Sequence, residues 1–278
     1  MQIPKLVVFD VDGTLVNWDG VVTPATTAAL NRLRALRVPI ALATGRPMAL
    51  APLTIDQAGG ADWMVCGNGS VVFDVPTGEL IRDRSLPNEV VVPLIQALRQ
   101  RLPGVGFAVE LLTTLLEEPG FARRVPEDRV APPVDDVLAA YLAAPEPVRR
   151  VIPYHDDYDD RLDELASIVS EFLDDRCQIQ FGGLAIVDVS PSGDHKAAAL
   201  QVLIDHLGIE AVDVIAFGDG SNDIEMLQWA GTGVAMGNAD PATKAAADVV
   251  TGDVDAGGVA EYLRPLLGLG AERGSTRK

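Results

Sequence analysis

The sequence predicts an α/β fold in which a parallel sheet carries a second, α+β domain inserted into it. Three observations lead to this prediction. Short apolar runs alternate with helical patterns at both ends of the chain, and the middle changes to a hairpin-like pattern. The 278 residues also exceed the roughly 100 to 200 residues of a usual domain. We therefore expect a core formed by residues 1–83 and 191–278, with residues 84–190 as a separate domain.

The first part of the chain is predicted to alternate between strand and helix. Residues 6–9 form a short apolar run rich in β-formers, which is typical of a parallel strand buried on both faces. Thr23 and Pro24 suit the N-cap and first position of a helix, because proline fits the first turn. Residues 40–43 predict a second buried strand, and Pro47 suits the start of another helix.

The same alternation returns at the end of the chain. Asp194 can cap a helix that stops at Gly208, where glycine favours helix termination. The expected elements are a helix over 196–207, strands over 214–217 and 233–236, a helix over 241–247, a strand over 249–250 and a helix over 259–267.

The middle of the chain has a different pattern. Gly182 and Gly183 separate two strand candidates and therefore predict an antiparallel hairpin. The expected elements are a helix over 88–102, a strand over 107–109, an irregular Pro-rich stretch that includes APPVDD, a strand over 150–154, a helix over 162–172 and the hairpin strands 178–181 and 184–189. This mixture indicates an α+β domain.

Charge and cysteine content limit the classes of partner and compartment. The 40 acidic against 22 basic residues give a formal net charge of −18, which argues against nucleic acid or an anionic membrane as the main partner. An anionic substrate then has to be held locally, by a metal ion, a helix N-terminus or a few cations. Cys66 and Cys177 are far apart and do not suggest a disulfide framework. No signal-peptide or membrane-span pattern is visible, so we expect a cytoplasmic protein.

Four polar clusters follow apolar runs or open helices. They are DVDGT at Asp10, TGR at Thr44, DHK at Lys196 and GDGSND at Asp219. Residues just beyond the carboxyl ends of neighbouring parallel strands converge on one crevice, so clusters distant in sequence can form one site. Carboxylates suit Mg²⁺, and hydroxyl, ammonium and amide donors suit phosphate oxygens. The ligand candidates are Asp10, Asp12, Asp219 and Asp223, and the phosphate-binding candidates are Thr44, Gly45, Lys196 and Asn222.

The Asp10 and Asp12 pair suits phosphoryl transfer through a covalent intermediate. A spacing of two residues puts both side chains on the same side of an extended segment, and Gly13 lets the chain turn away. One carboxylate can attack phosphorus and become an aspartyl phosphate, while the other moves protons. An EF-hand is excluded, because neither DVDGTL nor DGSNDI has glycine at loop position six, and Val21 and Ala230 replace the glutamate at position twelve.

The four motifs in this order resemble the haloacid dehalogenase superfamily of phosphohydrolases. The insertion between the second and third motifs, together with the late GDGSNDIEML, is similar to the Cof-type branch of phosphatases. The resemblance implies a Rossmann-like core with a mobile cap and assigns roles to the motif residues. Asp10 is the implied nucleophile and Asp12 the acid/base, Thr44 and Lys196 bind phosphate, and Asp219 and Asp223 serve Mg²⁺. Ala197 departs from the glycine of many relatives, which we expect to alter local packing rather than chemistry.

Several further polar residues are candidates for substrate contact. Arg46 can be a crevice cation or a structural salt-bridge donor, and Asn68 in CGNGS can be a turn residue or face the crevice. His195 is expected to have no catalytic role. In the insertion the candidates are Glu110, Arg123, Arg124 and His155, for which charged surface positions are the alternative interpretation.

These features predict a cytoplasmic, Mg²⁺-dependent phosphatase of small phosphorylated metabolites, such as sugar phosphates. Two alternatives stay open at this point. One is a sugar phosphomutase that uses the same intermediate, and the other is a non-catalytic metabolite-binding protein that keeps the fold. Neither the substrate nor the oligomeric state follows from the sequence.

Overall fold

The computed structural model describes residues 3–125, 133–181 and 186–268. The chain forms two compact units. One comprises Met1–Leu42, Ile55–Trp63 and Gly208–Lys278, and the other comprises Ala43–Thr54 and Met64–Leu207. The predicted boundaries of core and cap, 1–83 with 191–278 and 84–190, stay a prediction.

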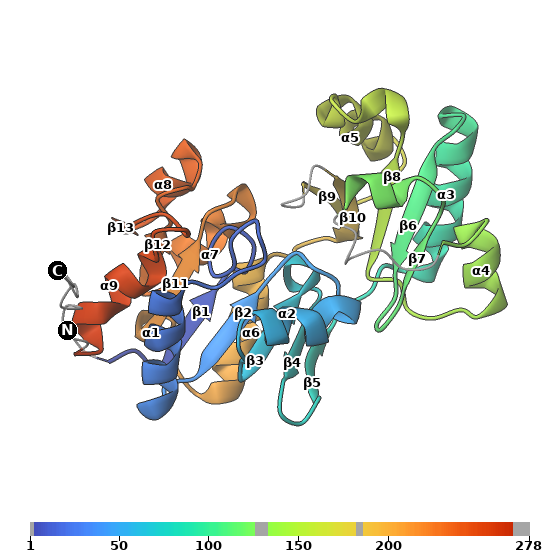
Figure 1. Cartoon of the computed structure of the whole chain (residues 1–278). Coiled ribbons are helices and arrows are strands. Elements are labelled where there is room, and N and C mark those ends of the chain that lie inside the picture. The colour runs from blue at the N-terminus through green and yellow to red at the C-terminus, as the bar shows by residue number, and fades with distance from the viewer. Residues whose placement is uncertain (1–2, 126–132, 182–185, 269–278) are drawn as a thin grey trace. The chain divides into compact units, whose positions relative to one another are not determined.

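The larger of two sheets has eight strands in the order β13-β12-β11-β1-β2-β3-β4-β5 (Figure 1). Strand β1 is completely buried and pairs in parallel with β11 and β2. Phe9 of β1 stacks on Phe217 of β11 with ring centroids 5.1 Å apart. The parallel core sheet is therefore confirmed, and β5 at its edge pairs antiparallel with β4. Its strands are β1 (Leu6–Phe9), β2 (Ile40–Ala43), β3 (Trp63–Cys66), β4 (Val71–Asp74), β5 (Leu80–Asp83), β11 (Val214–Gly218), β12 (Thr232–Ala235) and β13 (Val249–Val250).

Helices α1 and α9 of the first unit contact each other, as Figure 1 shows. The predicted N-cap of α1 is confirmed, because the hydroxyl of Thr23 accepts a hydrogen bond from the backbone N–H of Thr26 at 3.2 Å. Asp240 caps α8 in the same way, with donors from Ala242 and Thr243. The helices of this unit are α1 (Pro24–Ala35), α7 (Ile224–Trp229), α8 (Pro241–Ala246) and α9 (Gly258–Leu266).

The second unit contains a separate five-stranded antiparallel sheet in the order β7-β6-β8-β10-β9. Helices α3, α4 and α5 gather around its strands (Figure 1). The predicted α+β insertion is therefore confirmed, because it has an antiparallel sheet of its own. Its elements are α3 (Asn88–Arg101), β6 (Gly106–Glu110), β7 (Leu115–Glu117), α4 (Val137–Ala143), β8 (Arg150–Tyr154), α5 (Leu162–Ser170), β9 (Cys177–Phe181) and β10 (Val187–Pro191). Helices α2 (Ala51–Gln57) and α6 (Lys196–Leu207) precede and follow this part of the chain.

The two faces of the antiparallel sheet carry different side chains. Phe107 and Val109 of β6 pack into the main apolar cluster with α3 and α5, whereas Ala108 between them packs with Ile152 and Tyr154 of β8. This alternation follows from the period of two along a strand. Glu110 has the same parity as Ala108 and therefore belongs to the face that α3 and α5 do not cover.

The observed elements differ from the predicted ones at several places. Strands β3, β4, β5 and β7 and helices α4 and α7 were not predicted. Residues 184–185 of the predicted second hairpin strand lie outside the described residues. The observed strand is β10, and its antiparallel pairing with β9 is confirmed. Gly182 and Gly183, and residues 131–132 of the APPVDD stretch, lie outside the described residues. Among the described residues no helix combines the length and apolar character that a membrane crossing requires.

Candidate active site

Three of the predicted acidic ligands converge in the first unit. Asp10 follows β1 directly, and Asp219 follows β11, the strand paired with β1. Asp223 ends the short 3-10 turn η7 (Ser221–Asp223) that also contains Asn222. Asp10, Asp219 and Asp223 each offer one carboxylate oxygen, and these three oxygens lie within 4.8 Å of one another. Asp12 lies in the turn after β1, where it forms an isolated β-bridge with Val16.

Neutral donors hold the carboxylate of Asp219 in place. Its Oδ1 accepts a hydrogen bond from the hydroxyl of Thr14 at 2.7 Å, and its Oδ2 accepts one from the side-chain amide of Asn238 at 3.2 Å. The same amide also donates to the carbonyl of Gly13 at 2.8 Å. Asn238 therefore joins the loops after β1 and β11. Asn238 was not among the predicted site residues, although its place shortly after an apolar strand was a usable signal.

Asp223 holds the backbone of this loop. Its Oδ2 accepts hydrogen bonds from the backbone N–H groups of Asp219 and Gly220, both at 3.0 Å. These contacts fix the turn that presents Asp219. Asp223 was predicted as a metal ligand, and these contacts give it a further role in positioning the loop.

Gly13 is required where it stands. Its φ of +86° lies in the left-handed region, and a Cβ built there would lie 2.3 Å from Oδ2 of Asp219. A side chain at this position would therefore collide with the carboxylate. Asp219 can approach the loop after β1 this closely only because residue 13 is glycine.

The carboxylate cluster fits a small divalent cation. Mg²⁺ binds oxygen ligands at about 2.0 to 2.1 Å, so two opposite ligands lie about 4.2 Å apart. The spread of up to 4.8 Å among the three oxygens needs a contraction of only some tenths of an ångström. Converging carboxylates are also the arrangement that a cation stabilises most, since like charges repel one another. Asp10, Asp219 and Asp223 are therefore the residues that could hold a metal.

A second group of predicted residues is assembled in the second unit. The backbone N–H of Thr44 donates to Val65 of β3 at 2.9 Å, and the backbone N–H of Asn68 donates to the carbonyl of Thr44 at 3.0 Å. The hydroxyl of Thr44 accepts a hydrogen bond from the backbone N–H of Arg46 at 3.0 Å. A Cβ at Gly45 would lie 3.1 Å from Oδ1 of Asn68. The segments after β2 and β3 therefore pack closely together.

The guanidinium of Arg46 points into the protein. It donates to the hydroxyl of Thr54 at 3.1 Å, and the residue is only 5% exposed. This contact favours the structural interpretation of Arg46 over an open crevice cation. Asn68 adopts a left-handed conformation with φ of +54° in the 3-10 turn η2 (Gly67–Gly69), which asparagine tolerates better than most residues.

Lys196 is the first residue of α6 and is 1% exposed. The turn η2 lies against the residue before it, because a Cβ at Gly69 would lie 2.5 Å from the carbonyl oxygen of His195. Arg82 of β5 ties the two segments. Its Nε donates to the carbonyl of Gly69 at 2.8 Å, and its other guanidinium nitrogen binds Asp194 at 2.6 Å.

Neither Arg82 nor the ion pair of Asp194 was predicted from the sequence. The Asp194 carboxylate is fully buried and is also approached by Arg84 at 3.2 Å. Burial raises the pKa of Asp194, and the two arginines oppose that shift. Asp194 was predicted as a helix cap; the contacts described for its carboxylate are to Arg82 and Arg84.

The predicted substrate contacts in the insertion fall into two places. Glu110, at the end of β6, is fully buried and bonded to Arg150. Arg123 and Arg124 instead bind Asp156 at 2.7 and 2.8 Å, and Nε2 of His155 lies 3.1 Å from the carbonyl of Pro103.

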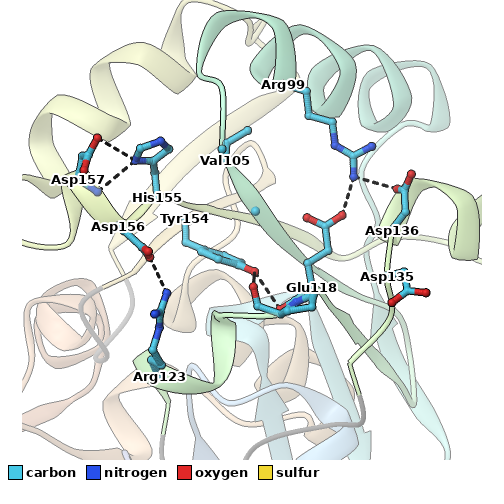
Figure 2. Close-up of a pocket in the computed structure, with 13 residues that line it drawn as sticks. Arg99, Val105, Glu118, Arg123, Asp135, Asp136, Tyr154, His155, Asp156 and Asp157 are labelled. Carbon is cyan, nitrogen blue, oxygen red and sulfur yellow. Dashed lines mark hydrogen bonds and ion pairs between the residues drawn. The ribbon is translucent and has the colours of Figure 1, made fainter.

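Arg123 and His155 line a pocket with a volume of about 670 Å³ at the other end of β6 (Figure 2). Gly106 faces Tyr154 there, whereas Glu110 faces Arg150. Four residues of strand span about 13 Å. Glu110 and the pocket therefore cannot contact the same small group.

Charged side chains around the pocket bind one another. Figure 2 shows Arg99 directed at Glu118 and Asp136, with distances of 2.5 and 2.8 Å, and Arg123 directed at Asp156. The hydroxyl of Tyr154 donates to the carbonyl of Glu118 at 2.9 Å. The charged side chains named here are therefore paired with other residues of the insertion.

Residues 7–263 match the haloacid dehalogenase-like hydrolase family. The chain belongs to this family. The resemblance indicated by the four motifs is therefore confirmed: the chain is a haloacid dehalogenase-like hydrolase of the Cof-type phosphatase branch.

The curated relatives include two phosphatases. HMP-PP phosphatase of Cronobacter sakazakii is 31% identical over 247 residues, which cover 85% of each chain. Pyridoxal phosphate phosphatase of Escherichia coli is 27% identical over 273 residues, covering 93% of this chain and 97% of that protein. The chloroplastic endoribonuclease YBEY of Arabidopsis thaliana is 30% identical over 277 residues, but this chain spans only 45% of its length.

Solved structures show the same fold for this hydrolase. A haloacid dehalogenase-like hydrolase from Bacteroides thetaiotaomicron superimposes with a TM-score of 0.82 at 28% identity, over 95% of this chain and 99% of the other. A subclass IIB sugar phosphatase of the superfamily has a TM-score of 0.78 at 29% identity, over 95% and 99%. The parallel core sheet and the inserted antiparallel sheet are therefore those of this subclass.

Proposed function

We propose that this hydrolase is a Mg²⁺-dependent phosphatase that releases phosphate from small phosphorylated metabolites through an aspartyl-phosphate intermediate. The observation that carries the proposal is the convergence of carboxylate oxygens from Asp10, Asp219 and Asp223. Phe9 pairs with Phe217 on one side and Leu42 on the other, so the segments that follow these residues leave the sheet at the same edge. Ligands of parallel α/β sheets bind at that edge.

The chemistry of the proposal divides between two carboxylates. An oxygen of Asp10 attacks phosphorus, the bond to the ester oxygen breaks, and Asp12 gives a proton to the departing alcohol. Asp12 then takes a proton from water, which attacks the aspartyl phosphate and frees Asp10. Thr44, Gly45, Lys196 and Asn222 bind the phosphoryl oxygens in this proposal. A divalent cation on the carboxylate cluster supplies positive charge that offsets the repulsion between the nucleophile and the phosphate.

The names of the relatives support a small phosphorylated metabolite as the substrate class. They include an HMP-PP phosphatase, a pyridoxal phosphate phosphatase and a sugar phosphatase. We propose that residues 84–190 act as the cap that selects among such esters. A cytoplasmic location belongs to the same proposal, and both cysteines being free is consistent with a reducing compartment.

The test is a screen of purified protein with Mg²⁺ against phosphorylated sugars, nucleotides and coenzymes. The expected result is release of inorganic phosphate from one subset of small esters. Product analysis by NMR separates a phosphatase from a phosphomutase, since the mutase returns the phosphoryl group to a sugar. No phosphate release from any ester in the panel, with the protein folded, would contradict the proposal.

A further inference from the structure

Three charged residues lie on neighbouring strands of the antiparallel sheet. They are Glu110 on β6, Arg150 on β8 and Asp188 on β10, and their exposed fractions are 0%, 3% and 0%. The Nε of Arg150 donates to Oε2 of Glu110, and another guanidinium nitrogen donates to Oδ2 of Asp188 at 2.7 Å. We call these three residues the carboxylate–arginine cluster. It lies on the sheet face that helices α3 and α5 do not cover.

Each carboxylate of the cluster keeps one oxygen without a donor. Oε1 of Glu110 and Oδ1 of Asp188 are both buried, and neither has a hydrogen-bond partner. A buried acceptor without a donor is costly, and proteins rarely retain one without a reason. An N–H or O–H group of a ligand would remove that cost.

The cluster adjoins the turn that carries Asn68. A Cβ at Gly67 would lie 3.5 Å from Oε1 of Glu110 and 3.7 Å from Nε of Arg150. The backbone of Met48 also hydrogen-bonds Glu110. Gly67 in turn donates to the carbonyl of Arg46 at 2.9 Å. The unpartnered oxygen of Glu110 therefore lies beside segments that contain proposed phosphate-binding residues.

The cluster offers acceptors but no uncommitted positive charge. Burial raises the pKa of Glu110 and of Asp188, and Arg150 opposes both shifts. With both carboxylates ionised the cluster has a net charge of −1, and with one protonated it is neutral. In neither state does it attract an anion. A second phosphate or a carboxylate on the ligand would meet repulsion at low local dielectric.

We propose that the carboxylate–arginine cluster recognises the leaving group of the substrate, accepting hydrogen bonds from its hydroxyl or amino groups and rejecting a leaving group that bears a second anionic group. This inference rests on the proposed function, since it concerns the alcohol released at the same site. It narrows the substrate class to phosphomonoesters of neutral or cationic polyols and amino alcohols. Neither Arg150 nor Asp188 was a predicted substrate contact.

The wild-type protein provides the first test, with three esters of similar size. Glucosamine 6-phosphate, glucose 6-phosphate and 6-phosphogluconate have cationic, neutral and anionic leaving groups. We expect kcat/KM for 6-phosphogluconate to be at least tenfold below that for glucose 6-phosphate, with glucosamine 6-phosphate at least equal to glucose 6-phosphate. Equal values for all three, or a preference for the anionic ester, would overturn the inference.

Two isosteric variants test whether the cluster causes the preference. Glu110→Gln and Asp188→Asn each remove one negative charge, so we expect the gap between glucose 6-phosphate and 6-phosphogluconate to shrink at least threefold. Glu164→Gln is the matched control, because it makes the same change at an exposed position of α5. If both folded variants keep the wild-type ratio, the cluster is structural only. If neither variant folds, the wild-type panel still decides.

A binding measurement separates this inference from the proposed function. Thermal shifts with the free alcohols, glucosamine and glucose against gluconate, need no turnover. Stabilisation by the first two but not by gluconate supports the cluster as a recognition site even if no ester is hydrolysed. Hydrolysis of p-nitrophenyl phosphate together with no charge preference in either assay would leave the proposed function standing and overturn the inference.

Discussion

The two units of the protein use buried carboxylates in different ways. In the first unit Asp10, Asp219 and Asp223 bring three carboxylate oxygens within 4.8 Å of one another. In the second unit Arg150 lies between Glu110 and Asp188, so each carboxylate faces a guanidinium. Converging carboxylates favour an added cation, whereas carboxylates separated by arginine already carry their counter-charge. The same side-chain type therefore forms a candidate metal site in one unit and an ion-paired cluster in the other.

The largest expected effect is that of Asp10→Asn. Loss of the nucleophile should reduce kcat by several orders of magnitude, because the covalent step has no substitute. Phosphate release from the best ester of the screen measures the effect. Asp19→Asn, the same change at an exposed loop position of the same unit, is the control that should retain activity. Near-native turnover by the Asp10 variant would remove the basis for treating the first unit as the catalytic one.

Removal of the metal ion should have the second-largest effect on activity. EDTA should abolish activity, Mg²⁺ should restore it, and the larger Ca²⁺ should restore it poorly, because Mg²⁺ prefers octahedral oxygen ligation. Mg²⁺ should also raise the Tm of the wild-type protein by binding the folded state.

Two variants test which of the two units binds the metal ion. Asp219→Asn should lose the Mg²⁺-dependent rise in Tm, whereas Glu110→Gln should keep it. An equal response of both variants to Mg²⁺ would contradict the assignment of the metal to the first unit alone.

Arg82 should have an intermediate effect as a positioning residue. It joins Gly69 of the turn η2 to Asp194, two residues before Lys196. Arg82→Gln should raise KM about tenfold to a hundredfold with a smaller change in kcat, because a small displacement of a binding residue can cost about 100-fold. Arg82→Lys should recover part of the loss by keeping the charge. Arg101→Gln, on the half-exposed surface of α3, is the matched control. A fall in kcat alone with unchanged KM would argue against this role.

The carboxylate–arginine cluster should make the free energy of unfolding modestly dependent on pH. Burial raises the pKa of Asp188, so the folded state holds its proton more tightly than the unfolded state does. This contribution to stability is present at low pH and is lost as the pH rises from about 4 through the raised pKa. Urea unfolding at pH 5 and pH 8 should therefore show a larger loss for the wild type than for Asp188→Asn. The same loss in both proteins would exclude Asp188 as its source.

Helix capping should give the smallest effect. Asp240 accepts hydrogen bonds from the backbone N–H groups of Ala242 and Thr243 and from the hydroxyl of Thr243. Asp240→Ala should lower the free energy of unfolding by about 1 kcal/mol, the usual cost of losing an N-cap. Asp255→Ala is the control, because Asp255 is exposed and its side chain contacts only the side chain of Asn17 among the described hydrogen bonds. Asp248→Ala would be a poorer control, because Asp248 accepts a hydrogen bond from the backbone of Gly233 in β12. An unchanged denaturation midpoint would show that α8 does not depend on its cap.

Much of the fold was predictable because its elements are local and strongly patterned. The predicted bounds of β1, β2, β8 and α6 are those observed. Strands β1 and β2 are uninterrupted apolar runs, and α6 lies between Asp194 and Gly208, which mark its two ends in the sequence. Strand β5 was missed because it lies at the edge of the sheet and its sequence mixes apolar with charged residues at partly exposed positions. Strand β4 was missed although VVFD is a mostly buried apolar run. Helix α4 has only seven residues and follows a Pro-rich stretch, so its periodicity is short.

The candidate site was predictable where chemistry and position coincide. Asp10, Asp219 and Asp223 stand directly after strands or within the loop that follows one, and they do meet. Arg150 and Asp188 were missed because tertiary pairing, rather than a motif, brings them to Glu110. Asp188 carried a usable signal, since it stands between the buried residues Val187 and Val189. A lone acid at such a position requires a partner from a neighbouring strand.

The two cysteines make this chain convenient for site-specific labelling. Cys66 and Cys177 are both free and buried, and burial raises the pKa of both thiols. Thiolates are the reactive form, so both native cysteines should react slowly with maleimides at neutral pH. A fluorophore pair attached through Asp19→Cys in the first unit and Glu164→Cys in the second would therefore report distances between the units, with no need to remove either native thiol.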